Sequence, residues 1–118
     1  MFDVNKNGII TVSRGDTFTL NVFINDGTSL EPIQYFLEEG DKVYFALMEP
    51  RKPFEEALIR KVFDKDDTNE KGLVVMSFTG EMTEFLVPGT YYYMIKLTKA
   101  LDNSIETIIS KTKFVILD

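Results

Sequence analysis

Residues 17–24 read TFTLNVFI, and this stretch decides the fold class. Apolar side chains occupy every even position from Phe18 to Ile24, whereas three of the four odd positions carry polar side chains. Side chains of a β-strand point alternately to opposite faces of the sheet, so this pattern is typical of a strand with one face on a core. The stretch predicts a sheet that buries one face, which favours an antiparallel arrangement.

Short apolar stretches recur along the chain, and turn-forming pairs such as Asn7-Gly8, Gly40-Asp41 and Pro88-Gly89 separate them. That spacing is typical of antiparallel β-proteins rather than of alternating strands and helices. Further strands are expected at residues 9–12, 42–49, 73–79, 90–98 and 105–117. We therefore expect an all-β protein, an antiparallel β-sandwich of about seven strands.

Residues 53–62 fit two structures. Pro53 in a first-turn position, with acidic residues after it and basic residues at the end, fits a short helix. Alternation over the second half fits a strand that the polar loop 64–71 would join, as a hairpin, to residues 73–79. We favour the strand because a hairpin partner is at hand, and one short helical turn stays open. Residues 30–39 are expected to cross one end of the sandwich as a loop.

The last apolar stretch, residues 105–117, changes phase along its length. Ile105 and Ile109 form one apolar set, and this set is out of phase with the later set that begins at Phe114. A one-residue slip moves every side chain of a strand to the other face of the sheet. We therefore expect a β-bulge or a kink near residues Ile109 to Thr112.

The chain has 118 residues and fits one domain, residues 1–118. It contains no Cys and no His, which excludes thiolate and imidazole zinc sites, Cys nucleophiles and triads with a His base. No Gly-rich phosphate loop is present, and no pair among the 19 acidic residues stands out for acid–base chemistry. We therefore expect no catalytic residues and no cofactor.

The formal net charge is −6, from 13 basic and 19 acidic residues. Residues 1–89 hold 9 basic and 16 acidic side chains and residues 90–118 hold 4 and 3, so no basic segment stands out. An acidic chain repels phosphates, and we expect no binding to nucleic acid. The N-terminus lacks the pattern of a signal peptide and no stretch is long enough for a membrane span, so we expect synthesis in the cytosol and no membrane partner.

Two clusters of oxygen-bearing side chains share features with calcium sites. Residues 3–10 match the front of a calcium loop, but Arg14 stands where a bidentate carboxylate is required, so an Asn-Gly turn is the preferred interpretation. Four acidic residues between Asp64 and Glu70 could bind Ca²⁺ weakly, but a solvated hairpin tip is the preferred interpretation. We expect no metal site.

Aromatic and Met side chains on the outward set of several strands are the candidate partner interface. In residues 42–49 both alternating sets are apolar, which predicts a central strand or a strand whose second face is covered. Several such side chains on one sheet make a patch of the kind enriched at protein interfaces. The alternative, that residues 30–36 or the segment after residue 50 folds over them, stays open. The candidate interface residues are Phe23, Tyr44, Tyr92 and Met94.

Residues 86–91 read LVPGTY and resemble the tyrosine corner of immunoglobulin-like sandwiches. Pro88 and Gly89 suit a tight turn, and the hydroxyl of Tyr91 can bond to nearby backbone. Together with Leu86, these residues are expected to form a structural corner rather than a reactive site.

The wider order of motifs resembles a narrower family. RGDT at residues 14–17, GDKVYF at 40–45, PGTYYY at 88–93 and KFVI at 113–116 each join a turn to a strand. This order is similar to small immunoglobulin-like domains of phages and prophages of Gram-positive bacteria, related to the N-terminal domain of the upper baseplate protein of lactococcal phages. The resemblance implies an immunoglobulin-like virion component, without enzymatic activity, that docks to copies of itself or to other tail or baseplate proteins.

Two other functions stay open. The first is a carbohydrate- or ligand-binding sandwich, although the chain has no Trp for a sugar platform. The second is an immunoglobulin-like module of a bacterial surface protein, which the missing signal-peptide pattern disfavours.

Overall fold

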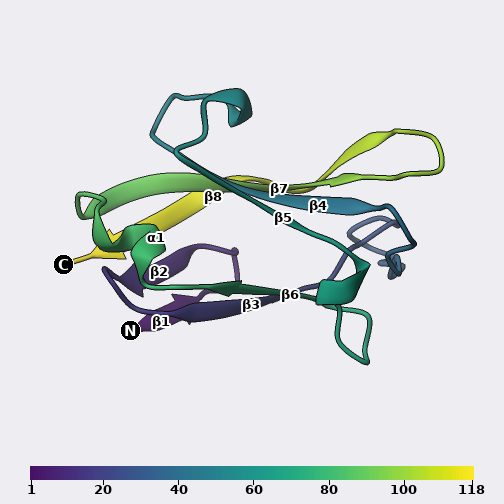
Figure 1. Ribbon diagram of the computed structural model, residues 1–118, viewed down its shortest axis with the longest axis horizontal. Helices are drawn as coiled ribbons and strands as arrows, with labels where there is room; N and C mark the ends of the chain where they lie inside the picture. The colour runs from purple at the N-terminus through teal and green to yellow at the C-terminus, as the bar shows by residue number, and fades with distance from the viewer.

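The alternating stretches of the sequence form strands in the computed structural model, which describes residues 1–118 (Figure 1). Three short helical turns join them. The strands are β1 (Phe2–Val4), β2 (Ile10–Ser13), β3 (Phe18–Val22), β4 (Lys42–Met48), β5 (Ile59–Phe63), β6 (Val74–Phe78), β7 (Gly89–Thr98) and β8 (Ile105–Leu117). The helical turns are η1 (Phe54–Glu56), η2 (Lys65–Asp67) and α1 (Glu81–Glu84). None of them is long and apolar enough to cross a membrane.

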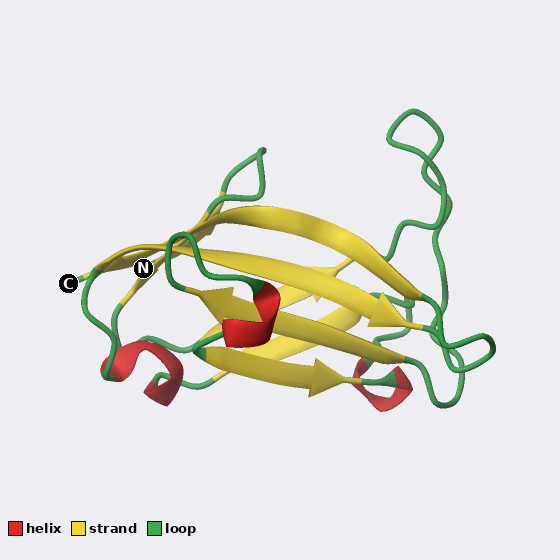
Figure 2. Ribbon diagram, turned by 90° about the horizontal axis from the view of Figure 1, so that it is seen from above, coloured by secondary structure: helices red, strands yellow, loops and turns green.

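The strands form two facing sheets, which confirms the predicted all-β sandwich (Figure 2). The large sheet has the order β1-β2-β8-β7-β4-β5, and the small sheet pairs β3 with β6. The order β8-β7-β4-β5 is that of strands G, F, C and C′ in variable-type immunoglobulin domains, and β3-β6 corresponds to B and E. The fold is therefore immunoglobulin-like.

One pair departs from the expected antiparallel arrangement, because β2 and β8 run parallel. Parallel partners need a long connection, and nearly the whole chain lies between these two strands. β2 lies between β8 and the edge strand β1, and the chain then turns back into β3 of the small sheet. The large sheet is consequently mixed, and it curls toward β3 on the side of β1, where the rings of Phe2 and Phe18 stack 5.2 Å apart.

The core fills the space between the two sheets with side chains from both inner faces. Phe45 of β4 is fully buried and its ring lies 4.7 Å from that of Phe78 on the small sheet and 5.6 Å from that of Tyr93. Offset and tilted aromatic pairs add to the burial of apolar area that stabilises the fold. The core set of β3 is the even-numbered set that the sequence predicts, from Phe18 to Ile24.

Residues 53–62 contain both predicted structures in succession, the turn η1 and then the strand β5. The predicted hairpin with residues 73–79 is wrong, because β5 pairs with β4 and β6 pairs with β3. The loop between them passes from one sheet to the other, since the apolar set of β6 must face the large sheet across the core. Lys61 spans this gap, with its Nζ 3.4 Å from the carbonyl oxygen of Ser77.

Strand β8 has the predicted bulge and a second one that the sequence did not reveal. Tyr93 pairs with Thr112 but Ile95 pairs with Ile109, so one extra residue of β8 lies between them, which confirms the first bulge. Lys96 then pairs with Thr107, which places another extra residue directly before Ile109. Each bulge moves the side chains beyond it to the opposite face of the sheet, so the inward set of β8 changes twice along the strand. The expectation that Ile105 shares a face with Ile109 is therefore wrong, and Ile105 is 69% exposed on the outside of the sheet.

Candidate functional site

The candidate site lies on the outer face of the large sheet, the face directed away from the small sheet. Residues paired across neighbouring strands point to the same side of a sheet. The register pairs Tyr44 with Val62 and Lys96, and it pairs Ala46 with Arg60 and Met94. All six side chains belong to the outer face. Tyr92, Lys113 and Ile105 extend it along β7 and β8.

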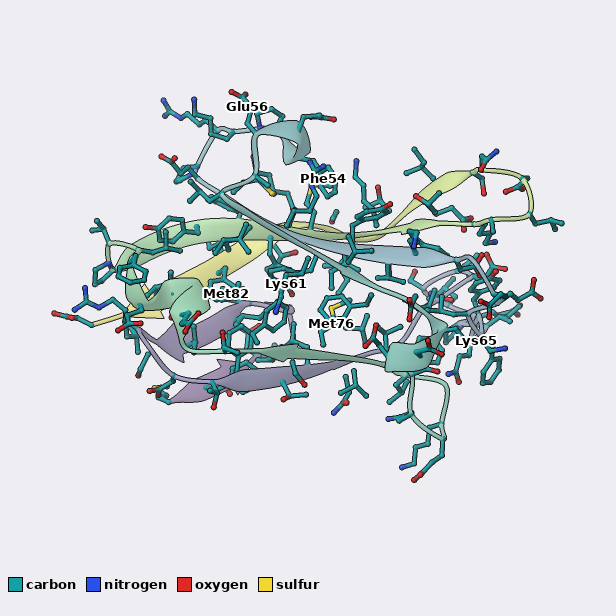
Figure 3. The ribbon with its side chains drawn as sticks, in the orientation of Figure 1. Phe54, Glu56, Lys61, Lys65, Met76 and Met82 are labelled. Atoms are coloured by element: carbon teal, nitrogen blue, oxygen red, sulfur yellow. The ribbon has the colours of Figure 1, made fainter.

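Residues 49–58, here called the covering loop, fold back over the centre of this face (Figure 3). Met48 and Ala46 belong to the outer set of β4, yet both are fully buried. The loop reaches as far as β8, because Lys111 Nζ donates to the Lys52 carbonyl oxygen at 3.0 Å. Of the two structures that the apolar pattern of residues 42–49 allows, both are present: β4 lies inside the sheet and its second face is covered.

Three of the four predicted interface residues therefore share one surface, and the fourth does not. Tyr44, Tyr92 and Met94 are half-buried on the outer face beside the covering loop. Phe23 follows β3 of the other sheet and is 43% exposed at a groove between β1 and β3 that also contains Phe2. The segment after residue 50 accounts for part of the burial, as the alternative interpretation allowed.

The covering loop and the sheet together build a cluster of cations around one aromatic ring. The Arg60 guanidinium carbon and Lys96 Nζ each lie 4.5 Å from the centre of the Phe54 ring. Arg60 also donates to the Phe54 carbonyl oxygen at 2.8 Å, which holds the ring and the guanidinium together. Cations over aromatic faces attract by about 0.5–1 kcal/mol at exposed positions. Tyr44 and Ile105 contribute apolar walls to a hollow of about 330 Å³ at this cluster, and Glu55 of the covering loop is the one acidic residue of its lining.

The outer face is basic although the chain is acidic. The outward positions of the large sheet hold five basic side chains, and the one acidic side chain among them is Asp3 at the far edge strand, β1. The basic side chains are Lys42, Arg60, Lys96, Lys111 and Lys113. With the covering loop included, the face holds seven basic and four acidic side chains, whereas the rest of the chain holds six and fifteen. A count along the sequence cannot show this separation, because alternation and strand order, not sequence proximity, gather the cations.

These cations are also free of intramolecular ion pairs. The four ion pairs of the structure join Met1 to Asp16, Arg14 to Asp118, and Lys99 to Asp26 and Glu106. None of them uses a cation of the outer face. A guanidinium has five N–H donors and an ammonium three, so Arg60 and Lys96 keep donors available toward the hollow. Chemically, the cluster can hold a carboxylate or another anionic group against an aromatic wall.

The predicted corner has the expected geometry and a structural role. The Tyr91 hydroxyl donates to the Val87 carbonyl oxygen at 2.6 Å, closing the turn four residues upstream. Gly89 has φ 152°, a conformation that side chains rarely adopt, which explains a glycine at this point. Leu86 and Tyr91 are partly buried and pack against the core. The corner thus fixes where β7 begins.

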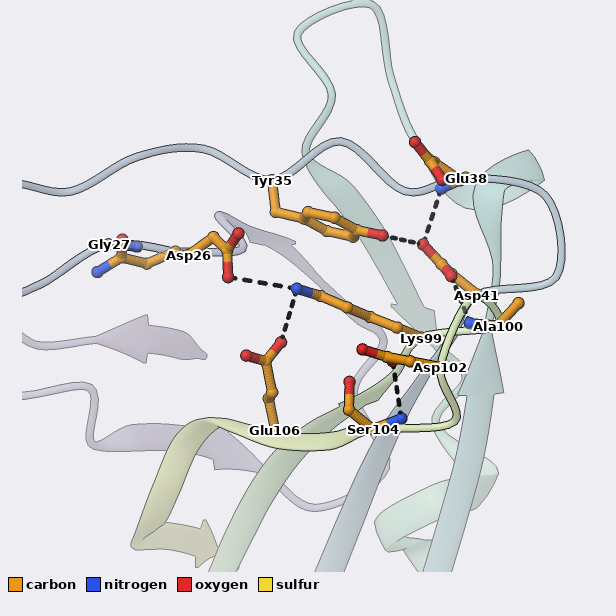
Figure 4. Close-up of polar contacts among 11 residues, drawn as sticks. Asp26, Gly27, Tyr35, Glu38, Asp41, Lys99, Ala100, Asp102, Ser104 and Glu106 are labelled. Atoms are coloured by element: carbon orange, nitrogen blue, oxygen red, sulfur yellow. Dashed lines mark hydrogen bonds and ion pairs between the residues drawn. The ribbon is translucent and has the colours of Figure 1, made fainter.

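A polar network at the opposite end of the sandwich was not found from the sequence (Figure 4). Asp41 is 1% exposed, and its carboxylate accepts hydrogen bonds from the Tyr35 hydroxyl at 2.6 Å and from the backbone N–H groups of Glu38 and Ala100, both at 2.9 Å. These bonds tie the β3–β4 loop to the β7–β8 hairpin. The sequence signal was weak, since Gly40-Asp41 reads as an ordinary turn.

The network shifts the ionisation of its members. Burial disfavours the charged form of Asp41, but the hydrogen bonds from Tyr35, Glu38 and Ala100 outweigh it and lower the pKa of Asp41 below its usual value. Burial and the Asp41 carboxylate raise the pKa of Tyr35. The hydrogen bond to Glu106, with a second to Asp26, raises the pKa of Lys99. All three shifts favour the hydrogen-bonded form seen in the fold.

The two oxygen clusters are engaged in turns. Asp64 caps η2, accepting from the N–H of Asp66, while the Asp67 carboxylate accepts from the N–H of Asp64, each at 2.9 Å. Asn5 accepts from the N–H groups of Asn7 and Ile9, which forms the Asn-Gly turn. No group of three or more acidic side chains is placed to hold a metal ion.

The fold and this face together define an immunoglobulin-like sandwich with a basic, aromatic surface on its large sheet. No protein-family model, curated protein or solved structure matches this chain.

Proposed function

We propose that this chain is a non-enzymatic structural domain of a phage or prophage particle, associated with the tail or baseplate, that acts through protein–protein contacts. The support for the particle is the resemblance of its turn-and-strand motifs to phage immunoglobulin-like domains. The support for protein–protein contact rather than catalysis is the outer face, with its cations and aromatic side chains. On this proposal the domain resides in the virion after synthesis in the host cytoplasm.

The observation that carries the proposal is the set of unpaired cations around Phe54. Aromatic side chains, Met and Arg are enriched at protein interfaces. Here Arg60, Phe54, Tyr44 and Met94 lie together on one sheet face. Cations that have no partner within their own chain supply both attraction and register to a partner of opposite charge.

Mass spectrometry of purified particles tests this function. Phage production is induced in a strain that carries the gene, particles are banded in a density gradient, and their proteins are quantified against a known tail protein. We expect the chain at a fixed ratio to that protein, with antibody labelling confined to the tail. Its recovery only from the soluble fraction of the lysate, in a preparation of intact tailed particles, would refute the proposal.

A further inference from the structure

The loops opposite the chain termini form a surface whose charge is the reverse of the outer face (Figure 1). This loop end consists of residues 25–41, 64–73 and 99–104, which carry ten acidic and three basic side chains. The Lys99–Asp26 ion pair and the bond from Gln34 to the Lys71 carbonyl oxygen hold the three segments together. The molecule therefore has a strongly acidic end and a basic sheet face.

The loop end also exposes large apolar side chains among its acids. Leu30 is 92% exposed and Leu101 90%, and Ile33 and Phe36 are each 60% or more exposed. Apolar groups ringed by charged ones are typical of a contact surface. The hollow on the outer face offers matching apolar walls from Tyr44, Phe54 and Ile105. Charge and apolar area thus match between the two surfaces.

We propose that the outer face of the large sheet binds the acidic loop end of a second copy of this chain. This inference rests on the proposed structural function and names its partner. A carboxylate of the incoming loop end would lie between Arg60 and Lys96, and an apolar loop tip would pack on Tyr44 and Ile105. Pairing of two outer faces is disfavoured, because it would bring like charges together.

Because the two surfaces differ, the contact is heterologous. Each copy keeps one free face and one free loop end after binding, so copies add in one direction and close into a ring or continue as a filament. The contact depends on exposed charges and weakens as salt screens them. These two properties distinguish it from a symmetric apolar dimer.

Sedimentation velocity of the purified chain, across a concentration series at low and high ionic strength, tests the contact. We expect species larger than the 13.6 kDa monomer at low salt and their loss at high salt. Lys96→Glu and, separately, Arg60→Glu should weaken association about tenfold or more. Lys6→Glu makes the same change of charge at an exposed position off the face and should leave association within about twofold of wild type. Circular dichroism checks that each variant is folded.

A mixing experiment identifies the partner surface. Asp66→Lys alters the exposed loop end and should also block association when it is alone. A mixture of Lys96→Glu and Asp66→Lys chains should associate again, because each supplies the surface that the other lacks. Restoration in the mixture is a result that misfolding of either variant cannot produce.

Three results would overturn the inference. The wild-type chain could remain a monomer at all concentrations; Lys96→Glu could associate as well as wild type; or a DNA duplex could bind the face in place of a second copy. If the chain is nevertheless present in purified particles, the proposed function stands and only the partner is wrong. If the chain self-associates as described but is absent from particles, the partner stands and the phage function fails.

Discussion

The loop end and the outer face of the large sheet both carry many charged side chains. The two regions differ in whether these side chains have hydrogen-bond or ion-pair partners within the chain. At the loop end, buried Asp41 accepts three hydrogen bonds and Lys99 contacts two carboxylates. On the outer face, Arg60 and Lys96 contact an aromatic ring and have no ion pair. A charge that is satisfied within the chain stabilises the fold, whereas one that is left open is available to a partner.

This difference separates two kinds of effect. Removing a satisfied buried group leaves its partners unpaired, and the cost appears in the free energy of unfolding. Removing an exposed, unpaired cation costs little stability, and the loss appears in binding.

Asp41→Ala should lower the free energy of unfolding by about 3 kcal/mol, because it leaves three donors, two of them backbone N–H groups, without an acceptor. Urea unfolding followed by circular dichroism measures the loss. Glu39→Ala removes an exposed acid from the same loop and should change stability by no more than about 0.5 kcal/mol. Equal losses in the two variants would show that the Asp41 hydrogen bonds add no more to the free energy of unfolding than an exposed acid of the same loop.

Because the pKa of Asp41 is lowered in the fold, we expect part of the free energy of unfolding to be lost at acidic pH. The folded state lowers the pKa of Asp41, so its contribution is complete above the unfolded value of about 3.9 and is lost as pH falls through the folded pKa. Asp41→Asn has no such titration. The difference in melting temperature between wild type and Asp41→Asn should therefore be constant from neutral pH to about 5 and should shrink below about 4. A constant difference down to about pH 2 would contradict this account.

Local patterns predicted most of the fold because each depends on neighbouring residues. Alternation in residues 17–24 gave the core face of β3, and the change of phase in β8 located its first bulge. The second bulge and the pairing of β5 could not be predicted in this way. The second bulge depends on how β8 pairs with β7 beyond Ile95. The pairing of β5 with β4 depends on how the strands divide between the two sheets around the core.

The site was predicted only in part for the same reason. Aromatic and Met residues on outward strand positions pointed to Tyr44, Tyr92 and Met94, since alternation alone places them. Lys96 and Arg60 are far apart in the sequence and meet Phe54 only after the covering loop folds back. Asp41 was missed because its three donors come from loop backbone and from Tyr35, which no short motif brings together.

Tyr91→Phe tests the corner, which lies away from both regions and should give an intermediate effect. The substitution keeps the ring and removes the hydroxyl that donates to the Val87 carbonyl oxygen, so we expect a loss of about 1 kcal/mol in urea unfolding. Tyr44→Phe is the matched control, because Tyr44 lines the open hollow and its hydroxyl makes no hydrogen bond within the chain. The control should stay within about 0.5 kcal/mol of wild type.

Lys96→Met should have the smallest effect on stability and so is the sharpest test of the comparison. Met keeps an apolar stem against Phe54 and loses only the attraction of the ammonium for the ring, about 0.5–1 kcal/mol. The chain should unfold at nearly the wild-type urea concentration while its salt-dependent self-association is reduced. A loss as large as that of Asp41→Ala would mean that the charge of Lys96 is satisfied within the fold. The outer face would then resemble the loop end, and its cations would no longer indicate a surface kept for a partner.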